Sequence, residues 1–449
     1  MKKITNLHSL LSQRFSRGNI IYRTQHADAD KEDPDSVQET ASQQFHQRLA
    51  QNQRTENLLN SLSNIKTEEE KYKVIKQLKD HVIDFPHTRI TAYKSNAIKQ
   101  MKQLLKTVTE EDAIRDIRIT LALLGSVENP KYPGVRLLSI DGGGCRGIVS
   151  IQIIRKLVEI SGKPLHELFD YICGVSTGAV IAFMFGLMKY DVDKAESIYR
   201  NFSSKIFSQN KWIGTGKLMM SHAFYDTETY QLVLKEIFGD EVLIDSAADI
   251  TAPKCSAVSV LVNRDVLKPF VWRNYSIVPG SRETHWPGTC RARLWEAVRA
   301  TSAAPGYFEE FKYNFNIHQD GGILANNPSG VGLFECRSLW PDAPIQCMVS
   351  LGTGRYEPFI GPNSPEFLSL KNKLLKILDS ATGTSEVHTI LYNLLPRKTY
   401  FRFNPFIREQ LYMDEYRPEK LDQLVDDTNQ YIHRNKYKFE QCVELLLKK

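Results

Sequence analysis

The sequence predicts an α/β protein with three layers around a mostly parallel central sheet, preceded by a short helical region. Two observations predict this fold class. Between about residue 135 and residue 351, short apolar segments typical of buried strands alternate with segments of helical periodicity. A glycine-rich run also follows the first of these strands directly and opens a helix, as in a βα unit.

The composition is that of a globular protein and excludes several classes. The chain has 449 residues, of which 42% are apolar and 24% charged, so it is not wholly disordered, collagenous or a multi-pass membrane protein. The net charge of +6 neither requires nor excludes an anionic partner, and we expect no nucleic-acid partner. Seven cysteines without a C-x-x-C pair argue against a disulfide scaffold or structural zinc, and favour reduced thiols in an intracellular protein.

The first 27 residues differ from the rest of the chain. They contain five Lys or Arg residues and no Asp or Glu, and apolar residues from Ile4 to Phe15 fall at helical spacing. This composition is typical of a mitochondrial transit peptide, and a disordered basic N-terminus is the alternative. A mitochondrial location is therefore favoured, with the endoplasmic reticulum and the peroxisome as alternatives.

A polar stretch and a helical region follow. Residues 28–60 have the composition of a polar linker or a frayed helix. Residues 61–128 show helical periodicity, which predicts either a cap on the edge of a domain or a small armadillo-like layer. The three predicted faces contain Ile75, Leu78 and Val82; Ile98, Met101, Leu104, Leu105 and Val108; and Ile114, Ile117, Leu121 and Leu124.

Beyond a break at residues 129–134, each element of the sheet is predicted from its apolar pattern. The uncharged stretch Tyr171–Met188 is long enough to cross a membrane, but its glycines and Ser-Thr pair favour a strand, a tight turn and a core helix. Predicted strands cover Val135–Ile140, Tyr171–Val175, Ala257–Val262, Phe270–Trp272, Met348–Leu351 and Tyr400–Phe403. Predicted helices cover Ile148–Ile160, the residues after Val175 through Met188, and Leu370–Leu378.

The first motif is the run from Asp141 to Gly147, Asp-Gly-Gly-Gly-Cys-Arg-Gly. Glycines let the backbone approach a ligand closely, and a helix N-terminus presents free N–H groups to an anion. The run also satisfies G-x-G-x-x-G, which would bind a dinucleotide in an oxidoreductase. That fingerprint requires an acidic residue at the end of the next strand, and the next strand ends differently.

The next strand ends in Gly174-Val175-Ser176-Thr177-Gly178, a G-x-S-x-G pattern between a strand and a helix. This is the context of a nucleophile elbow, in which the glycines at both ends leave room for a sharp turn that exposes the serine hydroxyl. One loop would then supply N–H donors for an oxyanion and the other the attacking oxygen. Together they predict an acyl-transfer site.

The base that activates Ser176 is less evident. A triad would use a downstream histidine such as His318, His388 or His433, and none lies in a distinctive loop. Asp320 stands before two glycines, Gly321 and Gly322, in a turn that could direct its carboxylate at a neighbouring loop. A turn aspartate that caps its own backbone is the alternative.

The ordered motifs Asp-Gly-Gly-Gly-Cys-Arg-Gly, Gly-Val-Ser-Thr-Gly and Asp-Gly-Gly resemble the patatin-like phospholipase family between Leu137 and Gly332. Segments Ser350–Gly354 and Tyr400–Asn404 are similar to a calcium-independent branch of it. The resemblance implies a patatin-like catalytic domain over 137–333, with 334–449 as a C-terminal extension of the same fold. It also implies a Ser–Asp dyad of Ser176 and Asp320, and an oxyanion hole at Gly142, Gly143, Gly144 and Arg146. Asp141 would have a structural role.

The function that the resemblance implies is a calcium-independent phospholipase, which acts at membrane surfaces and needs no cofactor or metal. It would release a fatty acid and a lysophospholipid through an acyl-enzyme. The alternatives are a serine esterase for other lipid esters (triacylglycerol, lysophospholipid or acyl-CoA), a catalytically silent lipid-binding protein, and the oxidoreductase described above. The oligomeric state is not predicted.

Overall fold

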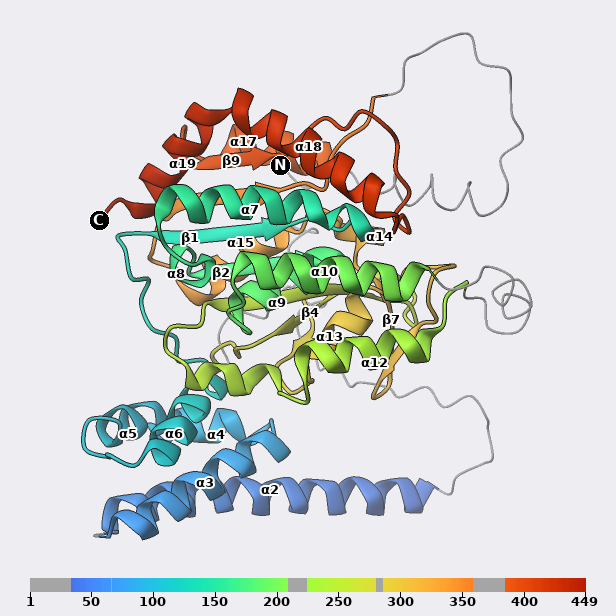
Figure 1. The fold of residues 1–449 in the computed structure, drawn as a ribbon. Coiled ribbons are helices and arrows are strands. Elements are labelled where there is room, and N and C mark those ends of the chain that lie inside the picture. Colours follow the sequence, from blue (N-terminus) through green and yellow to red (C-terminus); the bar gives the residue numbers. More distant parts are fainter. Residues whose placement is uncertain (1–33, 66, 209–223, 280–285, 358–383) are drawn as a thin grey trace, which may run out of the picture. The chain divides into compact units, whose positions relative to one another are not determined.

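We describe residues 34–65, 67–208, 224–279, 286–357 and 384–449 in a computed structural model (Figure 1). The chain divides into two compact units, Met1–Gln53 and Arg54–Lys449. Helix α2 (Pro34–Asn64) begins in the first unit and ends in the second. The predicted linker is thus helical from Pro34 onward, because no Gly or Pro interrupts it and its Gln and Glu residues are good helix formers. The predicted targeting segment and helix Leu370–Leu378 lie outside the described residues.

The helical region consists of α3 (Glu68–Asp84), α4 (Thr88–Lys94), α5 (Ala97–Leu104) and α6 (Glu111–Leu123). Their apolar faces bury a common core that contains Ile75, Leu78, Met101 and Ile117. Ile244 belongs to the same core and lies in the 3₁₀ segment η2 (Leu243–Ala248), far along the chain. The helical region therefore has a core of its own, distinct from the cores on the two faces of the sheet, and Ile244 and Cys290 of the later chain contribute to it.

A nine-stranded sheet lies at the centre of the second unit, in the order β5-β4-β3-β2-β1-β8-β9, with the β6–β7 pair joined to β3. The pairs β1–β2, β2–β3, β1–β8, β8–β9 and β4–β5 are parallel, whereas β4 and β7 are antiparallel to β3. The strands are β1 (Val135–Ile140), β2 (Tyr171–Val175), β3 (Lys254–Leu261), β4 (Lys268–Arg273), β5 (Gly288–Thr289), β6 (Phe311–Tyr313), β7 (Asn316–Asp320), β8 (Ile345–Leu351) and β9 (Tyr400–Phe403).

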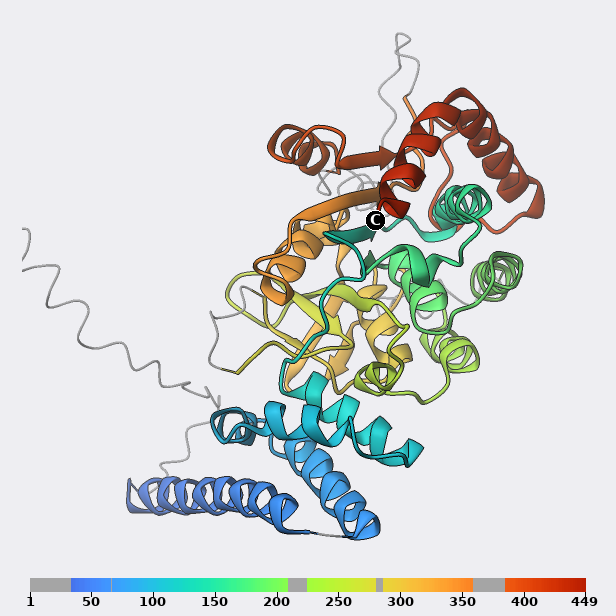
Figure 2. The same ribbon diagram turned by 90° about the vertical axis from the view of Figure 1, so that its left-hand side faces the viewer.

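Helices cover both faces of the sheet, which confirms the predicted three-layer fold (Figure 2). Leu138 and Ile140 of β1 face the core shared with α7 and α9, and Val135 and Leu137 face the core shared with α15. The helices of this part are α7 (Gly147–Ser161), α8 (Leu165–Leu168), α9 (Thr177–Gly186), α10 (Val192–Phe207), α12 (Thr227–Phe238), α13 (Leu294–Thr301), α14 (Gly322–Ala325), α15 (Ser329–Leu339), α17 (Thr384–Leu394), α18 (Pro418–Arg434) and α19 (Lys436–Leu447), with the 3₁₀ segment η1 at Gly144–Arg146.

The predicted strands recur with small differences in their bounds. Strand β3 begins at Lys254 rather than Ala257, because the Lys254 N–H donates to the carbonyl of Asp170 at 2.9 Å and extends the pairing with β2. The uncharged stretch after Asp170 forms β2 and α9, as predicted. Within the described ranges, no helix is long and apolar enough to cross a membrane. All seven cysteines are buried free thiols.

Candidate active site

Ser176 occupies a sharp turn between β2 and α9. Its backbone φ of 53° and ψ of −125° lie in a region that residues other than glycine rarely adopt. The Ser176 N–H donates to Thr301 Oγ1 at 2.9 Å, which fixes the turn. A Cβ at Gly178 would lie 2.3 Å from the Ile140 carbonyl oxygen, so only glycine allows this approach of α9 to the end of β1. The motif therefore has the geometry of a nucleophile elbow.

Asp320 is the last residue of β7, and its carboxylate lies next to the Ser176 hydroxyl. The Ser176 hydroxyl donates to Asp320 Oδ2 at 2.7 Å, and the Gly322 N–H donates to Oδ1 at 2.7 Å. The strand β7 is held by its antiparallel pairing with β3, with Asp320 opposite Ser259. A Cβ at Gly321 would lie 2.0 Å from the Val258 carbonyl oxygen, so the turn after Asp320 requires this glycine.

Burial controls the acidity of Asp320. The side chain is almost fully enclosed, and burial raises its pKa from the ordinary value to about 6. The hydrogen bonds from Ser176 and Gly322 act in the opposite direction, because they stabilise the carboxylate. The group is therefore ionised at neutral pH, and it is a stronger base than an exposed aspartate.

The glycine loop between β1 and α7 faces Ser176. Gly142 uses its N–H in a 3.2 Å hydrogen bond to the Asn326 carbonyl oxygen, so it is not a free donor. Among the described residues, the N–H groups of Gly143 and Gly144 have no hydrogen-bond partner. Arg146 folds back on the loop, and its Nε donates to the Gly143 carbonyl oxygen at 3.3 Å. Of the three predicted backbone donors, those of Gly143 and Gly144 are thus free among the described residues, while Arg146 lines a cavity at Ser176.

The same loop is anchored by the C-terminal part of the chain. The Cys145 N–H donates to the Met413 carbonyl oxygen at 2.9 Å. The Arg402 guanidinium binds the Asp141 carboxylate through two hydrogen bonds of 2.8 and 2.5 Å. Asp141 is buried in this ion pair and does not contact Ser176. The role of Arg402 was not predicted, although an arginine within the apolar strand Tyr400–Phe403 was a signal for a buried partner.

The histidines considered for a triad lie elsewhere. His318 Nδ1 is 3.0 Å from Ser259 Oγ, and burial lowers its pKa to about 4. His388 Nδ1 lies 3.3 Å from the Tyr400 hydroxyl, and His433 is exposed on α18. In the part of the chain that the structure describes, no histidine lines the cavities at Ser176. A histidine base therefore has no support from this geometry.

Two small cavities meet at Ser176 and Asp320. One, of about 50 Å³, has mostly apolar walls. The other, of about 40 Å³, is lined by Gly143, Arg146 and Asn326 among others. Sequence patterns did not single out the apolar lining as a site, because its residues come from elements that are distant in the chain. Its larger side chains are Val180, Phe202, Phe207, Tyr230, Tyr307 and Phe308.

Comparison with known proteins places these motifs in a family. A family model described as patatin-like phospholipase matches residues 138–331. The chain is 48% identical over 375 residues to calcium-independent phospholipase A2-gamma of rabbit (Oryctolagus cuniculus) and of human (Homo sapiens). Each match covers 83% of this chain and 47% of that protein, so the chain spans about half the length of these relatives.

A shorter bacterial protein also matches. A cGAMP-activated phospholipase of Vibrio cholerae is 30% identical over 252 residues, which cover 51% of this chain and 67% of that protein. Among solved structures, VipD of Legionella pneumophila aligns with a TM-score of 0.36 and 13% identity, over 68% of this chain and 67% of that one. This structural likeness is too weak to support a conclusion.

Proposed function

The chain belongs to the patatin-like phospholipase family, and on this premise we propose that it is a calcium-independent serine hydrolase of membrane glycerophospholipids. The products would be a fatty acid and a lysophospholipid. The observation that carries the proposal is the 2.7 Å hydrogen bond from the Ser176 hydroxyl to Asp320 at the mouth of an apolar cavity. Ser176 and Asp320 are proposed as the catalytic dyad.

In the proposed first step, Asp320 takes the hydroxyl proton as Ser176 Oγ attacks the ester carbonyl carbon. The negative charge that develops on the carbonyl oxygen is stabilised by the N–H groups of Gly143 and Gly144. The tetrahedral intermediate then loses the lysophospholipid alkoxide, which takes the proton from Asp320, and an acyl ester remains on Ser176. Loss of one oxyanion donor typically lowers the rate by about 100- to 1,000-fold.

In the second step a water molecule attacks the acyl ester while Asp320 takes its proton. Collapse of this intermediate returns the proton to Ser176 Oγ and releases the fatty acid. A carboxylate can act twice as a base here because burial brings its pKa to about 6, closer to the working pH than that of an exposed aspartate. The Gly322 N–H holds the other carboxylate oxygen and orients the base.

The apolar cavity supports a fatty acyl substrate. Phe202, Tyr230 and Phe308 enclose the space next to Ser176, and each buried methylene group of a chain would contribute about 0.8 kcal/mol. The other cavity, lined by Gly143 and Arg146, also adjoins Ser176 and Asp320, and we assign it to the leaving headgroup half of a phospholipid. Calcium independence is supported by a dyad whose chemistry uses no metal and by the names of the relatives.

The test is the hydrolysis of phospholipid vesicles in excess calcium chelator. Wild type is expected to release fatty acid, whereas Ser176→Ala and Asp320→Asn are expected to lose about 10³-fold or more of kcat. Ser338→Ala and Asp193→Asn make the same replacements outside the site, at a half-buried and an exposed position respectively, and are the matched controls. A fluorophosphonate reagent should label wild type but not Ser176→Ala.

The outcomes separate the alternatives. Activity that survives in Ser176→Ala would remove the proposed nucleophile. Activity lost in chelator and restored by calcium would contradict calcium independence. A folded wild type that hydrolyses no phospholipid, but does hydrolyse triacylglycerol, lysophospholipid or acyl-CoA, would keep the dyad and change the substrate.

A further inference from the structure

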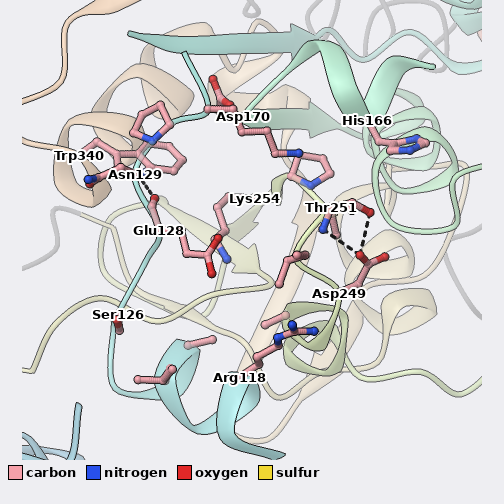
Figure 3. A pocket seen from close by; sticks show the side chains of 18 of the residues that line it. Arg118, Ser126, Glu128, Asn129, His166, Asp170, Asp249, Thr251, Lys254 and Trp340 are labelled. Atoms are coloured by element: carbon pink, nitrogen blue, oxygen red, sulfur yellow. Dashed lines mark hydrogen bonds between the residues drawn. The ribbon is translucent and has the colours of Figure 1, made fainter. Parts of the chain in front are cut away.

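A third cavity lies at the opposite end of the strands from Ser176. Its volume is about 460 Å³, within the range of small-molecule sites and far larger than either cavity at the dyad. Its walls come from α5, α6, the segment before β1, and the residues that precede β2 and begin β3. Figure 3 shows Asp170 and Lys254, which stand at the starts of these two strands, on its wall.

We call this cavity the basic pocket, because its lining has more positively than negatively charged side chains. Asp170 is occupied by Arg136, which binds it at 2.8 and 3.0 Å, and Asp249 pairs with Lys189. Glu128 is the one lining carboxylate to which the described structure gives no ion pair. Five cationic side chains face it across the pocket: Lys102, Lys106, Arg118, Lys131 and Lys254. The pocket therefore has a positive excess that a small anion would neutralise.

Lys254 is the most unusual of these groups. Its side chain is half-buried, and among the described residues its ammonium group has neither a hydrogen bond nor an ion pair. Burial lowers the pKa of Lys254, and the charge of Glu128 offsets this only in part. Figure 3 shows its side chain extending into the pocket beside Glu128. Because an unpaired charge that is partly removed from water costs free energy, an anion bound there would be favoured.

Arg118 adds a second buried donor. Its Nη1 binds the Ala248 carbonyl oxygen at 3.0 Å, while its Nε is buried without a hydrogen bond in the described structure. Phe169, Pro130 and Ile250 give the same pocket an apolar wall. Phosphate groups present several acceptor oxygens with at least one full charge, which suits separated lysines and an arginine. The volume leaves room for an organic group beyond the phosphate.

We propose that the basic pocket is a second site, distinct from the dyad, which binds a phosphate-bearing organic molecule with two or more negative charges. Two sources share this chemistry, namely a free phosphorylated solute and the headgroup of an anionic phospholipid. The proposal does not depend on the hydrolase activity, since it concerns binding at the other edge of the sheet.

The test measures binding of inorganic pyrophosphate to the full chain by calorimetry, and binding of phosphatidylcholine vesicles with and without phosphatidic acid. In at least one arm we expect wild type to bind and Lys254→Met to bind at least tenfold more weakly. The paired variant Lys102→Met/Lys106→Met should also weaken binding. The control Lys73→Met/Lys76→Met removes the same charge from exposed lysines of α3 outside the pocket, and it should bind as wild type does.

A further readout separates binding from folding. Without ligand, Lys254→Met is expected to melt at a higher temperature than wild type, because it removes an unpaired charge from a half-buried position. Wild type should gain thermal stability on adding pyrophosphate, and Lys254→Met should not. If Lys254→Met fails to fold, the paired variant Lys102→Met/Lys106→Met still decides the question. If wild type binds neither probe, or if the α3 control weakens binding equally, the proposal is overturned. Weaker binding of the pocket variants to pyrophosphate would identify a free phosphorylated solute as the ligand, and weaker binding to vesicles with phosphatidic acid would identify a lipid headgroup.

Discussion

Strand β1 carries a buried arginine–aspartate pair at each end, and the two pairs differ in what they hold. Near its start, Arg136 binds Asp170 and joins β1 to the residue before β2. Just beyond its end, Asp141 is bound by Arg402 from β9. The chemistry is the same at both ends, and all four side chains are buried.

The difference lies in the groups left unpaired beside each pair. At the carboxyl end, the pair fixes a loop whose Gly143 and Gly144 N–H groups are free among the described residues. At the amino end, the pair occupies the Asp170 carboxylate, and Lys254 in the wall of the same pocket has no ion pair among the described residues. A buried ion pair therefore does not by itself indicate a catalytic or binding site. The donors or charges that it leaves uncompensated indicate what each edge of the sheet can bind.

The largest effect is expected when the arginine of either buried pair is replaced. Arg402→Met and Arg136→Met each leave a buried aspartate without its partner, so each should lower the free energy of unfolding by about 3–5 kcal/mol. Only Arg402→Met should also lower kcat per folded molecule, by about 100-fold, because the oxyanion loop loses its anchor. Urea denaturation and vesicle hydrolysis measure the two effects. An equal loss of kcat in both variants would show that the two ends are not functionally different.

The second prediction concerns the charge at the dyad. The pKa of Asp320 is about 6 in the folded protein and about 4 in an unfolded chain, so wild type loses stability as the pH rises between these values. Asp320→Asn lacks this loss and should be more stable than wild type by about 3 kcal/mol at pH 8. At pH 4 the two should be nearly equal. Urea denaturation at both pH values measures this, and the same difference at both would exclude burial of the charge as its cause.

The third prediction is the pH dependence of the proposed reaction. Because Asp320 must be ionised to accept the proton, kcat/KM should fall about tenfold per pH unit below pH 6 and be level from about pH 7 upward. His388→Asn and His433→Asn should leave this profile unchanged. A profile that loses its acidic limb in either histidine variant would reinstate a histidine base.

The smallest expected effect concerns the apolar cavity. Val180→Ile adds one methylene group to a buried wall beside Ser176, and should reduce activity on long-chain relative to short-chain esters by about tenfold. Val331→Ile adds the same group on the other face of the sheet and is the matched control. Competition between esters of two chain lengths measures the ratio. An unchanged ratio in Val180→Ile would place the acyl chain elsewhere.

Much of the fold follows from local pattern. The apolar runs of β1 and β2 and the glycines around Ser176 are contiguous in sequence, so the strands and the elbow could be predicted closely. The partnership of Ser176 with Asp320 is different, because 144 residues separate them and the residues alone left histidine and aspartate open. The family resemblance supplied that expectation, and the structure places the two side chains within hydrogen-bonding distance.

The remaining features depend on contacts that sequence patterns do not encode. The glycine run predicts Gly142 as an oxyanion donor together with Gly143 and Gly144, yet the Gly142 N–H donates to the carbonyl oxygen of Asn326. Lys254 was not predicted as part of a strand or a pocket, because its surroundings are built by segments from four parts of the chain. The polar composition of residues 28–60 is shared by linkers and exposed helices, so it does not predict that α2 is a continuous helix from Pro34 to Asn64.

The anchoring of the glycine loop has a consequence for the newly made chain. Cys145 donates through its thiol to the Tyr412 carbonyl oxygen, 267 residues later, and its N–H uses the neighbouring Met413. At a synthesis rate of about 5–20 residues per second, the loop emerges from the ribosome roughly 13 to 50 seconds before the segment that anchors it. Ser176 is thus made early, but the proposed oxyanion loop is not anchored until Tyr412 and Met413 have been synthesised. The proposed catalytic site would therefore stay incomplete in the nascent chain until this later segment had emerged and folded against the loop.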